Sequence, residues 1–562
     1  MKKFTIALLL LVATAIVYGQ SPRMVIHEEF TSSTCGPCAS ANPTFHTWMV
    51  QHPDIYTSIF WHCNWPSPGN DPMYLANTVD NGSRISYYAV NSIPWAFVDG
   101  NVYGGIGSGL SWSVIQNRST VPSPFEVHMQ HQLNATQDSI QVTMLLKCTQ
   151  AVTAAMVAHN VVIEKYVHFT TAPGTNGEKD FYNVMKKMLP DKDGTNLPAS
   201  YAAGDYSVMQ YSWKLANVYD NNQLAAISFV QNKSTKEIYQ AGNSATTAIT
   251  MPYTNDVEMM QVSNYSTTNC SGKISPVVQI RNNGNATMTS LEIKYQVNNE
   301  PVSTYTWSGS LATLKKATVT LPVYSFNPMT SNTLKIYSNK PNNVNDEYPK
   351  NDTATVAIAS TVDVFGSVYV SVRTDNAPAE STWDIRDDVN TVIGSGGPYA
   401  LSNHLYKDTV DLPTPGCYTF TIYDAGGNGL CCGNGTGVYY VTTTTTPSVL
   451  IKSGSTFGNS EFTEFGSTEI GIRDLSGNDL TVYPNPFHGS ATISFTNRNA
   501  GHVTISLYNS YGQLVKTIDK GMIPSGNQEM TMDAADLSAG VYILKLQIGG
   551  EIITKKIAVE MK

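Results

Sequence analysis

The chain has 562 residues, long enough for several domains, and 14% of them are Asp, Glu, Lys or Arg. Its formal net charge is −9 and it has no basic cluster, so nucleic acid is not an expected partner. Thr, Ser, Asn and Gly are abundant, as in extracellular β-domains.

The first 19 residues have the features of an export signal peptide. Lys2 and Lys3 supply the positive start, and residues 4–18 form an apolar segment too short to span a bilayer. Small residues before Gln20 permit cleavage there. No later apolar run approaches membrane length, so we expect a secreted or surface-attached protein without a transmembrane segment after signal cleavage. Export also makes disulfides plausible.

Two cysteines separated by Gly-Pro give the most specific chemical signal. Cys35-Gly36-Pro37-Cys38 follows a predicted strand at 24–30 and precedes a predicted helix. Such a pair can cycle between dithiol and disulfide. Unpaired N–H groups at the start of a helix favour a thiolate. We therefore expect Cys35 to be the exposed nucleophile and Cys38 to be the resolving thiol.

This strand, loop and helix resemble the thioredoxin superfamily over residues 20–121. Glu29 lies six positions before Cys35 and is followed by Phe30, as the buried acid of that family is followed by an aromatic residue. The resemblance implies an α/β thioredoxin-like domain. It also implies that Glu29 passes a proton to or from Cys38.

A second part of the resemblance concerns substrate binding. Ile93-Pro94 matches the family's cis-proline and the residue before it, which face the cysteine pair across the site. The resemblance implies that Pro94 aligns the substrate backbone beside the sulfurs. Ile93, Gly36 and Pro37 are the expected substrate-positioning residues around it.

The cysteine pair has an alternative interpretation, a structural disulfide that never turns over. That role is the common one for an isolated pair in an exported protein. The accompanying acid and Ile-Pro favour redox activity, with protein thiols and disulfides as partners. The direction of electron flow stays open, because net reduction outside the cytoplasm needs a dedicated electron supply, whereas oxidation or isomerisation does not.

Residues 122–250 are predicted to form a β-domain. Alternating segments at 139–147 and 154–165 indicate strands, and 181–190 is predicted to be a short helix or crossover. A β-domain directly after a thioredoxin-like domain resembles the outer-membrane thioredoxin-like proteins of Bacteroidetes. The resemblance identifies no catalytic residue in this segment.

Two further β-sandwiches are expected next. Residues 251–360 predict an immunoglobulin-like sandwich, with strands at 274–280 and 291–297 and an Asn-Gly turn between them. A spacer or interaction role is expected for it. Residues 361–467 predict a glycine-rich, disulfide-containing β-sandwich. The predicted fold class is therefore a multidomain chain, an α/β thioredoxin-like domain followed by several all-β sandwiches of immunoglobulin-like or jelly-roll-like type.

A glycine-rich loop at 424–435 allows two interpretations. Asp424 and Asn428 could contribute oxygen ligands to calcium, which binds clustered oxygens. The EF-hand pattern fails because no acid stands at the closing position. A tight turn held by a disulfide is the favoured alternative. No other cofactor is expected.

The cysteines outside the Gly-Pro pair suggest one further disulfide. We expect Cys417 to pair with Cys431 or Cys432, because adjacent cysteines rarely pair with each other. No Cys/His tetrad has zinc-ligand spacing. Three cysteines have no partner assignable from the sequence: Cys63, Cys148 and Cys270.

After a linker at 468–477, residues 478–562 predict a small antiparallel β-sandwich with three ordered motif blocks, at 480–487, 540–546 and 555–559. These blocks resemble the type IX secretion sorting domain. The resemblance implies recognition by the type IX machinery and export through the outer membrane, followed by release or attachment to surface lipopolysaccharide. The alternative is a final sandwich without a targeting role.

Together these features predict a secreted or cell-surface thiol–disulfide oxidoreductase of oxidase or isomerase type that acts through Cys35 and Cys38. The alternative is a non-enzymatic adhesin or ligand-binding protein in which the thioredoxin-like domain is only a scaffold. The several β-modules without visible catalytic residues favour that alternative.

Overall fold

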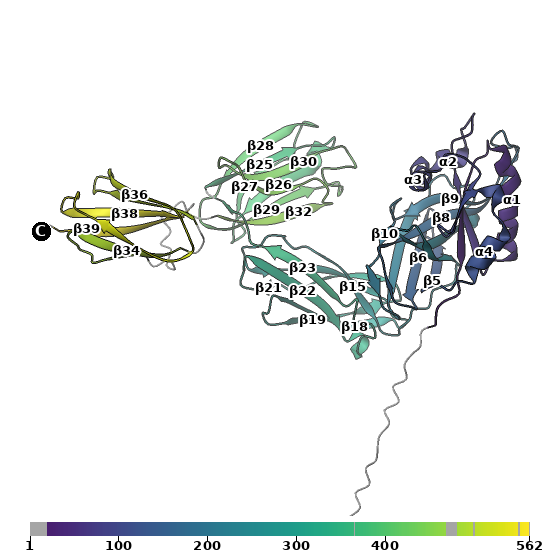
Figure 1. Ribbon diagram of the computed structural model, residues 1–562, viewed down its shortest axis with the longest axis horizontal. Helices are drawn as coiled ribbons and strands as arrows, with labels where there is room; N and C mark the ends of the chain where they lie inside the picture. The colour runs from purple at the N-terminus through teal and green to yellow at the C-terminus, as the bar shows by residue number, and fades with distance from the viewer. Residues whose placement is uncertain (1–18, 365, 468–479, 498–500, 549–550, 561–562) are drawn as a thin grey trace, which may run out of the picture. The chain divides into compact units, whose positions relative to one another are not determined.

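The computed structural model is mostly β, with many separate sheets (Figure 1). This confirms the predicted multidomain, mostly β character. The predicted signal peptide, apart from Gly19, and the predicted linker lie outside the described residues, which are 19–364, 366–467, 480–497, 501–548 and 551–560. The chain divides into two compact units, Met1–Pro252 and Tyr253–Lys562.

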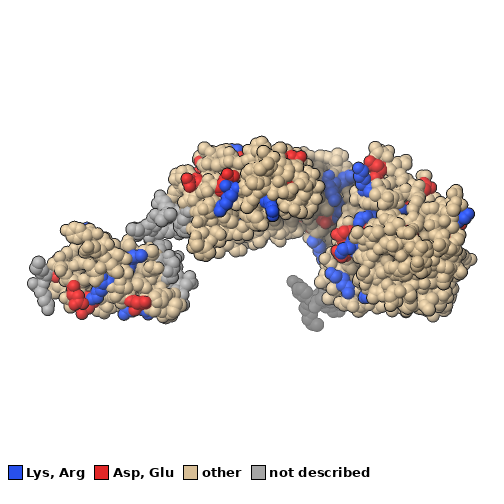
Figure 2. Space-filling model, turned by 90° about the horizontal axis from the view of Figure 1, so that it is seen from above, with Lys and Arg blue, Asp and Glu red and all other residues tan. Residues whose placement is uncertain are grey.

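Charged side chains are scattered over the face that Figure 2 shows, and most of that surface is formed by other residues. This agrees with the low charged fraction of the sequence. Within the described ranges, no helix is long and apolar enough to cross a membrane.

The first unit is built on one nine-stranded sheet. Its central strand β1 pairs in parallel with β2 and antiparallel with β3. The sheet takes strands from both predicted segments, 20–121 and 122–250. Its order is β14 (Ile238–Asn243), β13 (Leu224–Asn232), β8 (Met156–His168), β9 (Asp180–Leu189), β2 (Tyr56–His62), β1 (Val25–Thr31), β3 (Trp95–Val98) and β4 (Tyr103–Ile106), with β10 (Thr195–Asn196) paired to β8.

Helices cover both faces of this sheet. Ala41 and Phe45 of α1 share a core with β1, β2, β3 and Ile115 of α4. Ile85 and Tyr88 of α3 join the core on the opposite face. Every residue of β1 is buried, as expected for a strand covered on both sides. The helices are α1 (Gly36–Gln51), α2 (Pro72–Ala76), α3 (Thr78–Tyr88) and α4 (Trp112–Ser119), with 3₁₀ turns η1 (Gly107–Gly109) and η2 (Asn221–Gln223).

The predicted helix or crossover at 181–190 is wrong. This segment is strand β9, which pairs antiparallel with β8 and in parallel with β2 through Phe60 and Val184. Its burial shows no clean alternation, because the strand lies inside a wide sheet. Pairing on both edges overrides the helix propensity of its Met and Lys residues.

Smaller sheets complete the first unit. Strand β6 lies between β5 and β12, and its buried side chains form a separate apolar core with β8 and β13. The strands are β5 (Phe125–Leu133), β6 (Ser139–Cys148) and β12 (Tyr206–Lys214), and the pair β7 (Val152–Thr153) with β11 (Ser200–Tyr201).

The second unit contains three β-sandwiches, each with its own apolar core. In the first, one sheet has the order β15 (Val257–Ser263), β17 (Val277–Asn282), β20 (Lys316–Thr320), and the other has the order β19 (Ser303–Leu311), β18 (Met288–Val297), β22 (Ser331–Asn339), β23 (Thr353–Ala359). It also contains the strand pair β16 (Lys273–Ile274) with β21 (Tyr324–Ser325), and the turn η3 (Pro341–Asn343).

The other two sandwiches follow along the chain. In the middle one, one sheet has the order β24 (Asp363–Val364), β32 (Ser460–Ser467), β29 (Gly416–Asp424), β26 (Ser381–Arg386), β27 (Val392–Gly396). The other sheet has the order β28 (Leu405–Asp411), β25 (Ser367–Arg373), β30 (Val438–Thr443), β31 (Leu450–Gly454), and the turn η4 spans Pro378–Glu380. The last has sheets β33 (Thr481–Tyr483), β34 (Ser490–Asn497), β37 (Gly526–Asp533), and β36 (Leu514–Ile523), β35 (Gly501–Tyr508), β38 (Gly540–Ile548), β39 (Glu551–Val559).

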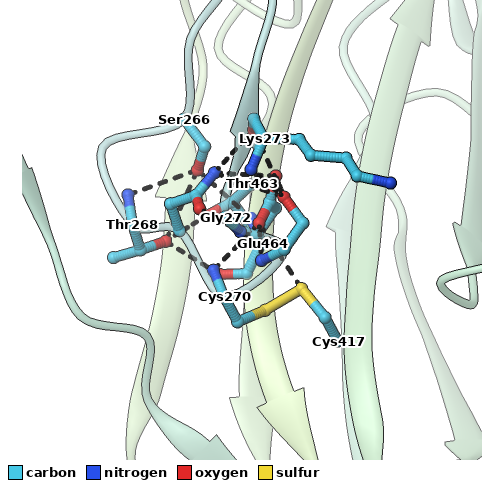
Figure 3. Close-up of a disulfide and its surroundings, with 10 residues drawn as sticks. Ser266, Thr268, Cys270, Gly272, Lys273, Cys417, Thr463 and Glu464 are labelled. Carbon is cyan, nitrogen blue, oxygen red and sulfur yellow. Dashed lines mark hydrogen bonds between the residues drawn. A yellow bond between two sulfur atoms is a disulfide. The ribbon is translucent and has the colours of Figure 1, made fainter. Parts of the chain in front are cut away.

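The predicted disulfide partner of Cys417 is corrected by the structure. Cys417 pairs with Cys270, across 147 residues of sequence, and Cys431 pairs with its neighbour Cys432. Cys417 lies on β29 of the middle sandwich, and Cys270 lies in a loop of the preceding one (Figure 3). The sequence could not supply this pairing, because the fold brings the two segments together.

Glu464 stabilises the same contact between the Cys270 loop and the middle sandwich. This β32 residue is 8% exposed, and its carboxylate accepts hydrogen bonds from the Cys270 and Ser271 amides, both at 3.0 Å, and from Asn269 Nδ2 at 3.2 Å. Burial raises the pKa of Glu464, and these donors oppose the rise. Thr268 Oγ1 donates to the Glu464 backbone oxygen at 2.8 Å. The carboxylate and the disulfide therefore hold one loop against the next sandwich.

Replacing this carboxylate should loosen the loop. In Glu464→Ala, two part-buried amides lose their acceptor, at a cost of about 1 kcal/mol for each hydrogen bond. We expect hydrogen exchange at Cys270 and Ser271 to become at least about tenfold faster. Glu461→Ala, on the same strand, is the control, and unchanged exchange in Glu464→Ala would contradict the assignment.

Candidate functional site

The cysteine pair closes a disulfide at the start of α1. Cys35 is the N-cap residue, its amide donates to Ser32 O at 3.1 Å, and its sulfur accepts the Cys38 amide at 3.2 Å. Pro37 stands in the first helical turn, where its missing N–H costs no hydrogen bond. The sulfur of Cys35 therefore lies where the helix N-terminus stabilises negative charge.

Burial separates the four residues of the motif. Gly36 and Pro37 are exposed, whereas Cys35 is 1% exposed and Cys38 is fully buried. The expectation of an exposed Cys35 is therefore wrong for the disulfide form. A segment that joins β8 to β9, here called the covering segment, is hydrogen-bonded to the backbone of the cysteine loop.

Asn176 from that segment binds the cysteine loop directly. Its Nδ2 donates to the backbone oxygens of Ser32 and Cys35, each at 3.2 Å, and its amide donates to Ser33 O at 3.2 Å. Asn176 Nδ2 also lies 3.2 Å from Glu178 Oε2, and Asn42 of α1 donates to the other Glu178 oxygen at 2.9 Å. The segment is thus fastened to both the loop and the helix.

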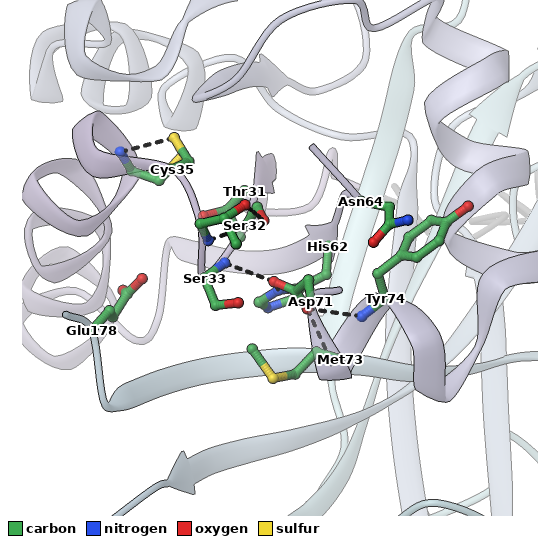
Figure 4. A network of polar contacts seen from close by, with 12 residues as sticks. Thr31, Ser32, Ser33, Cys35, His62, Asn64, Asp71, Met73, Tyr74 and Glu178 are labelled. Atoms are coloured by element: carbon green, nitrogen blue, oxygen red, sulfur yellow. Dashed lines mark hydrogen bonds and ion pairs between the residues drawn. A yellow bond between two sulfur atoms is a disulfide. The ribbon is translucent and has the colours of Figure 1, made fainter. Parts of the chain in front are cut away.

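A buried carboxylate fixes the loop from a second direction (Figure 4). Asp71 Oδ2 accepts the Ser33 amide at 2.7 Å and lies 3.0 Å from His62 Nδ1. Asp71 Oδ1 accepts the amides of Met73 and Tyr74, both at 2.9 Å, and caps α2. Burial would raise the pKa of Asp71, but His62 and these amides lower it to about 2.

Glu29 lies on β1 and is fully buried. Its Oε2 lies 3.0 Å from His27 Nε2, and its Oε1 has no hydrogen-bond partner among the described residues. Burial in apolar surroundings raises the pKa of Glu29 well above its usual value and lowers that of His27 to about 3. The raised pKa favours the protonated form of Glu29, and the lowered pKa favours the neutral form of His27.

Pro94 lies directly before β3, and Ile93 before it is half-buried. The Ile93–Pro94 peptide bond is cis. The Gly107 amide donates to Pro94 O at 3.0 Å, and a Cβ on Gly107 would lie 2.6 Å from Glu29 Oε1. A glycine is thus required where the chain passes between Pro94 and the Glu29 carboxyl group.

The structure therefore brings the predicted residues together in two groups. Cys35 and Cys38 are joined, and Glu29 and Pro94 meet through Gly107. In the described part of the chain, no hydrogen bond joins Glu29 to either sulfur.

The glycine-rich loop forms a tight turn. Asp424 Oδ2 accepts the amides of Asn428 and Gly429 at 2.9 and 3.0 Å, so one carboxylate oxygen already holds the backbone. Gly429 has a φ of +67°, which glycine adopts without strain. The adjacent disulfide Cys431–Cys432 lies in the same loop. Calcium binding by Asp424 and Asn428 stays a prediction.

In the described part of the chain, two cysteines lie outside the disulfides. Cys63 and Cys148 are free and buried, and burial raises the pKa of both thiols. Within the described ranges, one group has metal-ligand geometry, Cys270, Cys417 and Glu464, and its sulfurs are held in a disulfide.

Sequence reasoning missed several residues that hold the site. His27 was detectable in principle, because it lies two positions before Glu29 and so on the same face of the strand. His62 and Asp71 flank a proline-rich stretch with no recognisable motif. Asn176 gave no signal at all, since it lies 141 residues beyond Cys35.

Asp71 should stabilise the loop in a pH-dependent way. Its pKa lies near 2 in the folded chain and 3.8 without the fold, so its contribution of about 2 kcal/mol is complete above about pH 4 and is lost as pH falls towards 2. In Asp71→Asn, hydrogen exchange at Ser33 and Met73 should be faster than in wild type at about pH 6. The difference should vanish near pH 2, and a constant difference across this range would contradict the assignment.

Comparison with known proteins identifies the C-terminal part of the chain. Residues 481–560 match the family model of the secretion system C-terminal sorting domain. The search of curated proteins gave no match. The chain is similar to several solved structures: HBP35 of Porphyromonas gingivalis (14% identity, covering 61% of this chain and 99% of that chain, TM-score 0.33), a protein from Agrobacterium tumefaciens (13%, 42% and 100%, 0.29) and dimeric latent PorU of P. gingivalis (10%, 58% and 36%, 0.14).

The sorting domain has the predicted sandwich structure, with a core shared by both of its sheets. Its presence implies interaction with the secretion machinery and points to export through the outer membrane to a secreted or cell-surface location. The C-terminal part of the chain is therefore a type IX secretion sorting domain, as predicted.

Proposed function

We propose that the protein is a secreted or cell-surface thiol–disulfide oxidoreductase whose N-terminal segment, residues 20–121, is thioredoxin-like. The observation that carries the proposal is the Cys35–Cys38 disulfide at the N-terminus of α1, with the Cys35 sulfur accepting the Cys38 amide. A helix N-terminus favours the thiolate form of a cysteine placed there, and the thiolate is the form that reacts in thiol–disulfide exchange.

The reaction transfers two electrons from a substrate dithiol. One substrate thiolate attacks Cys35 Sγ, which forms a mixed disulfide and releases Cys38 as a thiolate. The second substrate thiolate then attacks the substrate sulfur of the mixed disulfide. The products are a substrate disulfide and a Cys35 thiolate that the helix N-terminus stabilises. An external disulfide of the glutathione class reoxidises the pair.

Glu29 supplies the proton in this scheme. Its carboxyl group is buried with a raised pKa, so it can protonate the Cys38 thiolate when that thiolate is released. The exposed Gly36 and Pro37 offer the substrate backbone a surface. The resemblance assigns the half-buried Ile93 and the buried Pro94 to the other side of the site. This assignment of roles follows the resemblance described above.

The sorting domain supports a role in which the protein acts on extracellular proteins. A type IX sorting domain takes its passenger through the outer membrane. We propose that the chain is then released or attached to surface lipopolysaccharide. Oxidation or isomerisation of surface proteins needs no electron supply from the cytoplasm, so either reaction suits this location better than net reduction.

A non-enzymatic adhesin or ligand carrier is the second candidate. The observation that favours it is the burial of Cys35, which hinders attack on the disulfide. The β-sandwiches of the second unit are consistent with a binding role.

Turnover separates the two candidates. The test follows oxidation of a reduced dithiol peptide by glutathione disulfide, catalysed by the full chain. We expect turnover by wild type and by Cys148→Ser, which alters a free buried cysteine, and none by Cys35→Ser. Equal rates for wild type and Cys35→Ser would reject the oxidoreductase and leave the binding protein.

The covering segment should control access to the pair. Asn176→Ala removes two hydrogen bonds to the cysteine loop, worth about 1–2 kcal/mol together. We expect the disulfide to react with dithiothreitol about tenfold faster in this variant. Asn101→Ala, which removes a comparable side-chain bond to Thr235 O, is the control. An unchanged rate in Asn176→Ala would show that the segment does not limit access.

A further inference from the structure

Three buried polar side chains form a continuous chain of hydrogen bonds beneath α1. The Tyr56 hydroxyl lies 2.8 Å from His27 Nδ1, and His27 Nε2 lies 3.0 Å from Glu29 Oε2. None of the three is more than 1% exposed. His27 and Glu29 share one face of β1 because they are two residues apart, and Tyr56 begins the neighbouring strand β2.

One direction of these hydrogen bonds is compatible with both protonation states of Glu29. A neutral imidazole donates from one nitrogen and accepts at the other. Glu29 Oε2 accepts from His27 Nε2–H when the carboxylate is ionised and also when the proton is on Oε1. Nδ1 then accepts from the Tyr56 hydroxyl. The arrangement leaves Glu29 Oε1 as the free atom, beside Gly107 and hence near Pro94.

Tyr56, at one end of this series of hydrogen bonds, is a lining residue of a cavity. The cavity has a volume of about 320 Å³, and its polar lining residues include His46, Lys165, Asn183 and Asn243. Val50, also in the lining, is 66% exposed, so the cavity reaches the molecular surface.

We propose that Tyr56 and His27 form a proton route between this cavity and Glu29, an inference that rests on the proposed function of the cysteine pair. His27 also acts as a positioning residue, since its hydrogen bond to Oε2 keeps Oε1 turned towards Gly107. Glu29 can then gain or lose a proton through these two side chains, and the protein core does not have to open.

The proton balance closes over a full redox cycle. When Glu29 gives its Oε1 proton to the released thiolate, His27 Nε2–H protonates Oε2, Tyr56 protonates Nδ1, and water in the cavity restores the Tyr56 proton. When the pair is reoxidised, the leaving proton returns by the same steps in reverse. The reverse transfer also restores the original tautomer of His27.

The other titratable side chains beside Glu29 stay neutral near neutral pH. Burial raises the pKa of Tyr103 on β4 and that of Cys63 after β2. The helix α1 contributes Phe45, whose ring lies 4.4 Å from the His27 ring. Neither Tyr103 nor Cys63 is hydrogen-bonded to His27 or Tyr56 in the described ranges.

The first test compares exchange rates of the Cys35–Cys38 pair across pH in the full chain. Tyr56→Phe removes only the hydroxyl, and His27→Gln keeps an N–H donor for Oε2 but cannot relay a proton. We expect both variants to react about tenfold more slowly than wild type, with an altered pH profile. Tyr103→Phe is the control and should match wild type. Wild-type pH profiles in both variants would overturn the proposal.

A second measurement does not depend on turnover. The His27 ring N–H should exchange with solvent through Tyr56, so its exchange rate, followed by NMR on the full chain, should fall about tenfold in Tyr56→Phe. Equal exchange in wild type and Tyr56→Phe would overturn the route even if the protein turns over. An inactive wild type with slowed exchange in Tyr56→Phe would reject the oxidoreductase and keep the route.

Discussion

The pairing of β1 with its two neighbours is the constraint on which the candidate site depends. In parallel register, β1 sets Val25 opposite Tyr56, and in antiparallel register it sets Phe30 opposite Trp95, directly after Pro94. The same strand carries His27 and Glu29 on one face and runs into the cysteine loop. A shift of one residue would turn both side chains away from α1 and dismantle the site.

Two distant segments then make the cysteine loop rigid. Asp71 holds Ser33 from the region after β2, and Asn176 holds Ser32 and Cys35 from the region before β9. Both act on backbone groups, so they fix the path of the loop that carries the buried Cys35. Access to the sulfurs is therefore a property of the whole first unit, since strands from both of its predicted segments share one sheet.

The sequence predicted those features of the structure that depend on residues close together in the chain. The sorting domain was predictable because its motif blocks lie within one small sandwich, and the position of Cys35 at a helix start followed from Gly36-Pro37. Contacts between distant segments were beyond reach, as the pairing of Cys270 with Cys417 and the cover by Asn176 show. The strand β9 was mistaken for a helix because its partners on both edges, not its own residues, decide its structure.

The central claim is that Cys35–Cys38 turns over, and its reduction potential tests this most directly. The full chain is equilibrated with glutathione or dithiothreitol buffers, and the reduced fraction of the pair is measured by alkylation and mass spectrometry. A redox-active pair should have a potential above about −300 mV, in the range of disulfide oxidoreductases. A potential below about −300 mV would mark the pair as a structural disulfide and contradict the account.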